Sequence, residues 1–172
     1  MAYTEVSFQD ASDIVTAAGL SDLVHLEKLS GGWANSNYKL SLNDNTNRVL
    51  KIWNGQTFDE VNYLLSISTY LSDNGVPTPS PIPFSNGEFV VVKNDLAWTL
   101  LPFVEGAWLE PNYSSLYSLG KIQASLHLVI PPVNLKDKYS MGYSLFDKLF
   151  SIAEREMNGQ IFCTCLNLKV PH

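Results

Sequence analysis

The chain has 172 residues, enough for one ordinary domain or for one and a half small lobes. Apolar residues make up 45% of it, so the chain can build a hydrophobic core, which excludes gross disorder. The net charge of −6 argues against a nucleic-acid-binding surface, because such surfaces are basic. Arginine occurs only as Arg48 and Arg155, which argues against a phosphate site built from several arginines.

The N-terminus shows no secretory signal, because Met1–Glu5 lacks a basic region followed by an apolar one. The longest apolar run, Leu96–Val104, is too short to span a bilayer. We therefore expect a soluble, cytoplasmic protein without a membrane partner. Cys163, Cys165 and His172 lie close together near the C-terminus, but three ligands are too few for a closed structural metal site. We predict no metal site in this chain.

The first third of the chain predicts one helix and three strands. Ser7 is a suitable helix N-cap, Asp10 is placed as a capping-box acid, and Gly19 is a suitable stop. Alternating apolar residues and two turn signals, Gly31-Gly32 and Asn43-Asp44-Asn45, then predict strands over Leu23–Leu29, Asn37–Leu42 and Arg48–Trp53.

The next fifty residues predict a helix and two further strands. Thr57 is the expected N-cap of a helix that ends near Asn74, and the proline-rich segment after Gly75 must be extended. Two short strands follow, at Glu88–Lys93 and Ala97–Phe103. The order helix, three strands, helix, two strands predicts an α+β fold: a five-stranded antiparallel sheet with one inserted helix.

Two helices are predicted after Gly106. Apolar spacing favours a helix from Pro111 to about Ile130, and another from Tyr143 to about Met157. His127 follows the apolar stripe of the first of these helices, and we expect it to be a buried structural residue rather than a base.

Lys51 is the most informative single residue, because it lies inside an apolar strand. Burial of an unpaired ammonium is costly, so such a lysine must find an anion or lose its charge. A glycine turn over a strand-borne lysine is how kinase-like folds hold nucleotide phosphates. The alternatives are that Lys51 snorkels from an edge strand and that Gly31-Gly32 forms an ordinary hairpin turn.

Six motifs follow one another in the chain: Tyr3–Ser7, Asn35–Tyr38, Arg48–Ile52, Gly75–Ile82, Leu101–Gly106 and Leu119–His127. In this order they resemble the N-terminal half of the aminoglycoside phosphotransferase and choline kinase superfamily, and most closely type II homoserine kinases. The resemblance covers roughly residues 3 to 130.

This resemblance implies a protein-kinase-like small lobe over residues 1–102. It implies a hinge and the first helices of an incomplete large lobe over residues 103–159, and we expect an atypical tail at 160–172. The implied activity is ATP-dependent phosphorylation of a hydroxyl group on a small metabolite. Homoserine is the first candidate, followed by other amino-alcohols and aminoglycosides.

The resemblance also implies which residues bind the nucleotide. The loop and the lysine would hold the phosphates, an acidic residue would orient the lysine, and the hinge would offer backbone groups to adenine: Gly31, Gly32, Asn35, Asn37, Lys51, Glu60, Leu101 and Phe103. Each has a structural alternative. The asparagines are ordinary turn residues, Glu60 can close a capping box with Thr57, and the hinge residues can be core strand.

Two elements of the superfamily are missing. Phosphoryl transfer needs a carboxylate to orient the nucleophile and oxygen ligands for Mg²⁺. The superfamily takes these from an H-x-D-x-x-x-x-N loop and a later aspartate motif, and neither occurs in this sequence. The chain ends before they would appear, and Phe162–His172 resembles an alternative or out-of-frame ending.

We therefore predict no catalytic residue, no magnesium ligand and negligible kinase activity for this chain alone. A small-molecule hydroxyl substrate would be a partner only with the missing lobe present. The alternative function is a non-catalytic nucleotide-binding or partner-binding fragment, or a truncated isoform.

Overall fold

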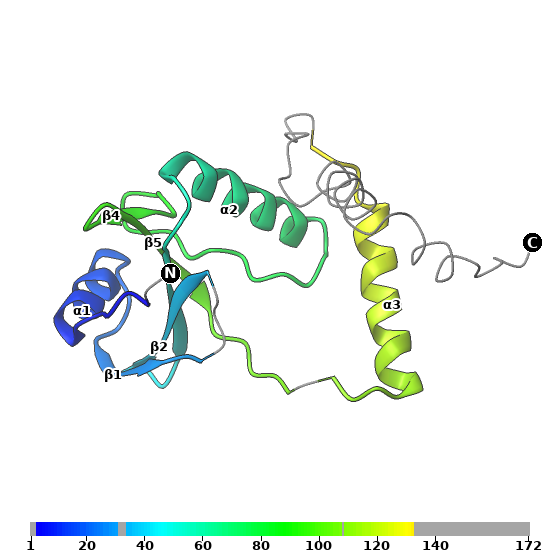
Figure 1. Ribbon diagram of the computed structural model, residues 1–172, viewed down its shortest axis with the longest axis horizontal. Coiled ribbons are helices and arrows are strands. Elements are labelled where there is room, and N and C mark those ends of the chain that lie inside the picture. Colours follow the sequence, from blue (N-terminus) through cyan, green and yellow to red (C-terminus); the bar gives the residue numbers. More distant parts are fainter. Residues whose placement is uncertain (1–2, 31–33, 108, 133–172) are drawn as a thin grey trace, which may run out of the picture. The chain divides into compact units, whose positions relative to one another are not determined.

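The computed structural model describes residues 3–30, 34–107 and 109–132. The chain divides into two compact units, Met1–Ile130 and Pro131–His172, and all the elements below belong to the first. They are α1 (Phe8–Ala17), β1 (Leu23–Lys28), β2 (Asn35–Leu42), β3 (Asn47–Trp53), α2 (Phe58–Asp73), β4 (Val91–Lys93), β5 (Leu96–Pro102) and α3 (Tyr113–Leu128) (Figure 1). The helix predicted at Tyr143–Met157 and the tail at 160–172 lie outside the described residues.

The five strands form one antiparallel sheet in the order β1-β2-β3-β5-β4. The α+β prediction, with α2 inserted between β3 and the last two strands, is confirmed. β3 lies between β2 and β5, so the strand that carries Lys51 is central. The alternative that Lys51 snorkels from an edge strand is therefore wrong.

Helix α1 covers one face of the sheet. The Ser7 hydroxyl accepts a hydrogen bond from the Asp10 N–H at 3.0 Å, as the predicted N-cap requires. Three apolar residues of the helix are buried against a cluster contributed by β2, β3 and β5: Ala11, Ile14 and Val15. Gly19 follows the helix with φ +65°, a conformation that favours glycine and ends the helix there.

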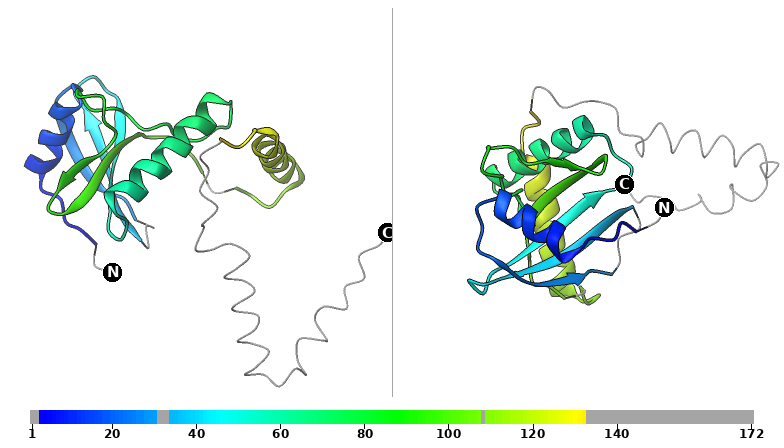
Figure 2. Two further views of the ribbon diagram at one scale, coloured as in Figure 1. Left: turned by 90° about the horizontal axis from the view of Figure 1, so that it is seen from above. Right: turned by 90° about the vertical axis from the view of Figure 1, so that its left-hand side faces the viewer.

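Helix α2 covers the opposite face. Thr57 and Glu60 form the predicted capping box at its start. Val61 and Leu65 are buried in a second cluster with Trp53 of β3 and Ala97 of β5. The turned views show α1 (blue) and α2 (green-cyan) on opposite sides of the sheet (Figure 2). Each face of the sheet therefore has its own helix and its own core.

Two tight turns set the register of the hairpins. Asn45 adopts φ +61°, and the Asp44 carboxylate accepts from the Thr46 N–H at 3.0 Å, as expected for the predicted turn between β2 and β3. Between β4 and β5, Asn94 and Asp95 adopt φ +52° and +60°, as in a type I′ turn. β4 begins later than predicted, at Val91.

Helix α3 begins after Asn112, whose side-chain oxygen accepts from the Ser115 N–H at 2.9 Å. None of its residues is buried, and its apolar face is open, with Leu116 59% exposed. His127 is also exposed, so the prediction that it is buried is wrong. The reason is that no element in the described ranges covers this face. None of the three helices in those ranges has the length and hydropathy needed to cross a bilayer.

Candidate functional site

A polar row crosses the face of the sheet that α2 covers. In the strand register Asn37 of β2 pairs with Lys51 of β3, which in turn pairs with Thr99 of β5. Side chains alternate between the two faces of a strand, so these three point to one face while Leu50 and Ile52 point to the other. Sheet pairing thus brings together Asn37 and Lys51, two of the predicted nucleotide ligands.

Lys51 is half-buried, and this burial lowers the pKa of its ammonium group below the usual lysine value. Its Nζ atom lies 3.8 Å from the centroid of the Trp53 ring, a cation–π geometry. The indole is fixed in turn, because Trp53 Nε1 donates to the fully buried Thr99 Oγ1 at 3.0 Å. The ammonium is therefore partly desolvated and supported on one side by an aromatic face.

Asn35 and Asn37 lie at the start of β2, where it follows the predicted glycine turn. The Asn35 side-chain oxygen accepts from the Asn54 N–H at 3.2 Å, which links the start of β2 to the residue after β3. Gly31 and Gly32 lie outside the described residues. The structure therefore describes Asn35 and Asn37 of the predicted phosphate site, but not its two glycines.

Glu60 lies in the capping box with Thr57, which was the structural alternative to a role beside Lys51. Its carboxylate accepts from the Thr57 N–H at 2.8 Å and from the Thr57 hydroxyl at 3.0 Å, at the N-terminus of α2. A carboxylate there also interacts favourably with the helix dipole. Its role in orienting Lys51 remains a prediction.

Leu101 and Phe103 lie where β5 leaves the sheet. Leu101 pairs with Val49 of β3 on one side of β5. On the other side β4 reaches only Trp98, and the Ile82 N–H donates to the Leu100 carbonyl at 2.9 Å. Within the described ranges no strand pairs with this edge beyond Leu100. Because backbone groups alternate between the two edges of a strand, those of Leu101 face β3, and the role of the hinge backbone in binding adenine stays a prediction.

Several residues with a place in this site were missed by sequence reasoning. Trp53 was counted only as an apolar neighbour of Lys51, and Thr99 only as part of an apolar run. Ser36 is fully buried between Asn35 and Asn37, and its alternation with them was the available signal of a polar group on the core face.

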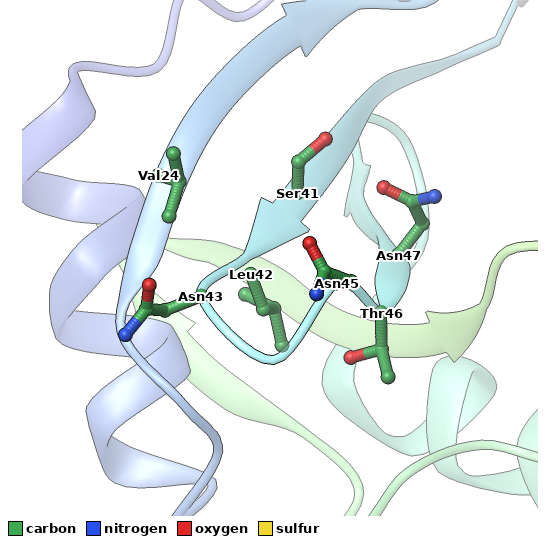
Figure 3. A pocket seen from close by; sticks show the side chains of 7 residues that line it. All are labelled: Val24, Ser41, Leu42, Asn43, Asn45, Thr46 and Asn47. Carbon is green, nitrogen blue, oxygen red and sulfur yellow. The ribbon is translucent and has the colours of Figure 1, made fainter.

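A separate open cavity of about 310 Å³ lies at the β2–β3 turn, lined by Leu42, Asn43, Asn45 and Asn47 among others (Figure 3). This turn is at the opposite end of β2 from Asn35, and none of the predicted site residues lines the cavity. No group of three or more histidine, cysteine or acidic side chains in the described part of the chain could hold a metal ion.

The sequence matches one protein-family model, described as "Phosphotransferase enzyme family", over residues 25–155. Among similar curated proteins, the homoserine kinase of Nitrobacter hamburgensis is 24% identical over 152 residues, 88% of this chain and 47% of that enzyme. The homoserine kinase of Cupriavidus pinatubonensis is 28% identical over 130 residues, 73% of this chain and 39% of the enzyme. The chain thus spans about half the length, or less, of these relatives.

Two solved structures share the fold. A spectinomycin phosphotransferase in complex with ADP and spectinomycin has a TM-score of 0.67 at 17% identity, covering 88% of this chain and 48% of that chain. An amicoumacin kinase in complex with AMP-PNP has a TM-score of 0.53 at 14% identity, covering 94% and 55% respectively. At these identities the similarity establishes a kinase-like α+β fold.

Proposed function

Because this chain belongs to the phosphotransferase enzyme family, we propose that its sheet binds the phosphates of ATP. In this proposal Lys51 contacts the phosphates, and Asn35 and Asn37 line their path together with the backbone of Gly31 and Gly32. The backbone at Leu101 and Phe103 receives adenine. The nucleotides in both similar structures, ADP and AMP-PNP, support the choice of ligand.

The observation that carries the proposal is the setting of Lys51. An ammonium on a central strand, with its pKa lowered by burial and Asn37 opposite it, is a site prepared for an anionic ligand. A bound phosphate would restore the electrostatic stabilisation that burial removes from the ammonium. Glu60 would orient this lysine if its carboxylate left the capping box.

The parent activity we propose is phosphoryl transfer from ATP to the hydroxyl group of a small molecule, with homoserine first, and other amino-alcohols and aminoglycosides after it. The homoserine kinases that match the sequence support this order. Such transfer requires a carboxylate beside the nucleophile and Mg²⁺ at the phosphates. The sequence lacks the H-x-D-x-x-x-x-N loop that would supply the carboxylate, so we expect the 172-residue chain to bind ATP without transferring its phosphate.

Isothermal titration calorimetry with ATP tests this function. Lys51→Ala should weaken binding at least tenfold, because a hydrogen bond to a charged group contributes about 1.5–3 kcal/mol. Lys121→Ala, on the exposed surface of α3, is the matched control and should bind like the wild type. Equal affinities of wild type and Lys51→Ala would refute the role of Lys51.

The same titration separates the second candidate, a non-catalytic partner-binding fragment. The open apolar face of α3, which includes Leu116, Leu119 and Ile122, favours this candidate. Absence of ATP binding in the wild type would favour it over a nucleotide-binding function. Mg²⁺-dependent ATP turnover by the purified chain would instead contradict the expected lack of transfer.

A further inference from the structure

Residues Tyr3–Val6, which we name the N-terminal strap, precede α1 and belong to no helix or strand. The strap lies on the α1 face of the sheet, because Tyr3 and Val6 pack against the apolar cluster of that face. It bonds to β1, to β2 and to the residue that follows β3. All these contacts are at the end of the sheet where Asn35 and Asn37 lie.

The Tyr3 hydroxyl bonds to both backbone polar groups of Asn37. Its hydroxyl accepts a hydrogen bond from the Asn37 N–H at 2.9 Å and donates one to the Asn37 carbonyl. The same carbonyl accepts from the Leu29 N–H at 2.9 Å, where the pairing of β1 with β2 ends. The Tyr3 ring is fixed in turn, with Lys28 Nζ 3.8 Å from its centroid. Tyr3 thus continues the hydrogen bonding of β2 past the end of the strand pair.

Thr4 fixes the residue between the two asparagines. Its N–H donates to Ser36 Oγ at 2.7 Å, and Asn54 Nδ2 donates to the same oxygen at 3.0 Å. The Thr4 hydroxyl donates to Asn54 Oδ1 at 2.8 Å, and the Asn54 N–H donates to Asn35 Oδ1 at 3.2 Å. Because Ser36 is fully buried, loss of these partners would leave an unsatisfied polar group in the core.

Two further contacts hold the strap in place. The Tyr38 hydroxyl donates to the Thr4 carbonyl at 2.9 Å and accepts from the Val6 N–H at 3.2 Å. A phenol is protonated at neutral pH, so this hydroxyl is a donor there, and burial raises the pKa of Tyr38 further, to about 12. On the outer side, Glu5 forms an exposed ion pair with Lys28 at 2.8 Å.

We propose that the N-terminal strap positions Asn35 and Asn37 for the nucleotide from the face of the sheet opposite Lys51, with Tyr3 and Thr4 as positioning residues. This inference rests on the proposed nucleotide function. The ends of strands fray, and a ligand then has to order them at a cost in affinity. The hydrogen bonds from the strap to Ser36 and Asn37 hold the start of β2 in place before the ligand binds.

Tyr3→Phe tests the proposal in the full 172-residue chain, because it keeps the ring and removes only the hydroxyl. We expect the dissociation constant for ATP to rise about three- to tenfold, the range for loss of one or two hydrogen bonds. Amide hydrogen exchange at Asn37 should become faster, since its N–H loses its acceptor. Tyr117→Phe, the same chemical change on the exposed surface of α3, is the matched control and should alter neither quantity.

The possible results distinguish a failure of the strap proposal from a failure of the proposed ATP binding. Wild-type ATP affinity in Tyr3→Phe, with binding lost in Lys51→Ala, would overturn the strap proposal and leave the nucleotide site standing. Weaker binding without faster exchange at Asn37 would also overturn it, because the effect would not pass through that backbone. No ATP binding by the wild type would overturn both. If circular dichroism shows that Tyr3→Phe is unfolded, Thr4→Ala decides instead, because it removes the bond to Asn54 and retains the strap backbone.

Discussion

The two faces of the sheet, built from the same strands, have opposite characters. On the α1 face Leu40, Leu50 and Leu100 are fully buried, and the polar groups of the strap are hydrogen-bonded to β2 and to Asn54. On the α2 face the same strands present Asn37, Lys51 and Thr99, with an aromatic ring beside the ammonium. The period of two in a strand therefore separates the core residues of the α1 face from the residues that we propose bind the nucleotide.

The largest difference between the faces should appear in stability. Leu50→Ala should lower the free energy of unfolding by about 2–5 kcal/mol, because it leaves a cavity in the α1-face core. Lys51→Ala, its neighbour on the other face, should change the same quantity by less than about 1 kcal/mol, since it also removes a desolvated charge. Urea denaturation of both variants measures this contrast, and similar losses in the two would contradict the division between the faces.

A smaller effect is expected from the aromatic support of Lys51. Trp53→Leu should weaken ATP binding about two- to fivefold, because a cation–π contact at a partly exposed site contributes about 0.5–1 kcal/mol. The pKa of Lys51 should fall further below its usual range, since the ring stabilises the charged form. Calorimetry gives the affinity, and NMR of ¹³C-labelled lysine side chains gives both the pKa and the ring-current shift.

Trp53→Phe is the control for this substitution, because it retains an aromatic ring but cannot donate to Thr99. Its affinity for ATP should lie between those of the wild type and Trp53→Leu. If Trp53→Leu binds ATP like the wild type, and the lysine resonances do not move, the ring has no part in placing the ammonium.

The last effect appears only at high pH and concerns Tyr38, on the α1 face. Burial, the largest cause, raises the pKa of Tyr38 from 10.0 to about 12, so the folded state favours the neutral phenol more than the unfolded state does. This contribution to stability is complete below the unfolded pKa, about pH 10, and is lost as the pH rises toward about 12. Urea denaturation across that range should show the decline, and Tyr38→Phe should decline less steeply. Parallel pH dependences would contradict the assignment.

Local signals made most of the fold predictable. Ser7 and Thr57 identified the starts of α1 and α2, because a capping bond involves residues three apart. Asn45 identified the β2–β3 turn because the positive φ and the Asp44–Thr46 bond of that turn are also local in the sequence. The pairing of β3 with β5, and hence the central position of β3, depends on contacts between distant residues, for which the sequence has no local signal. β4 is shorter than predicted, since the residues before Val91 lie outside the strand although two of them are apolar.

In the candidate site, too, local features were predictable and tertiary contacts were not. Lys51 stood out because an ammonium in an apolar run is a conflict visible in the sequence itself. Trp53 under its ammonium, and Tyr3 against Asn37, are contacts of tertiary structure that neither spacing nor composition reports. His127 was wrongly expected to be buried because an apolar stripe shows only that a face needs a cover, and the described residues contain none.

The antiparallel pairing of β3 with β5 also sets an order of events in folding. β2 and β3 meet across a short turn, whereas β5 joins β3 only after residues 54–95 have closed a long loop containing α2. Contacts of high sequence separation form slowly, because the entropy of loop closure must be overcome first. In a refolding experiment the hairpin should therefore precede the pairing of Lys51 with Thr99, and ATP binding should appear late, as a reporter of the completed lobe.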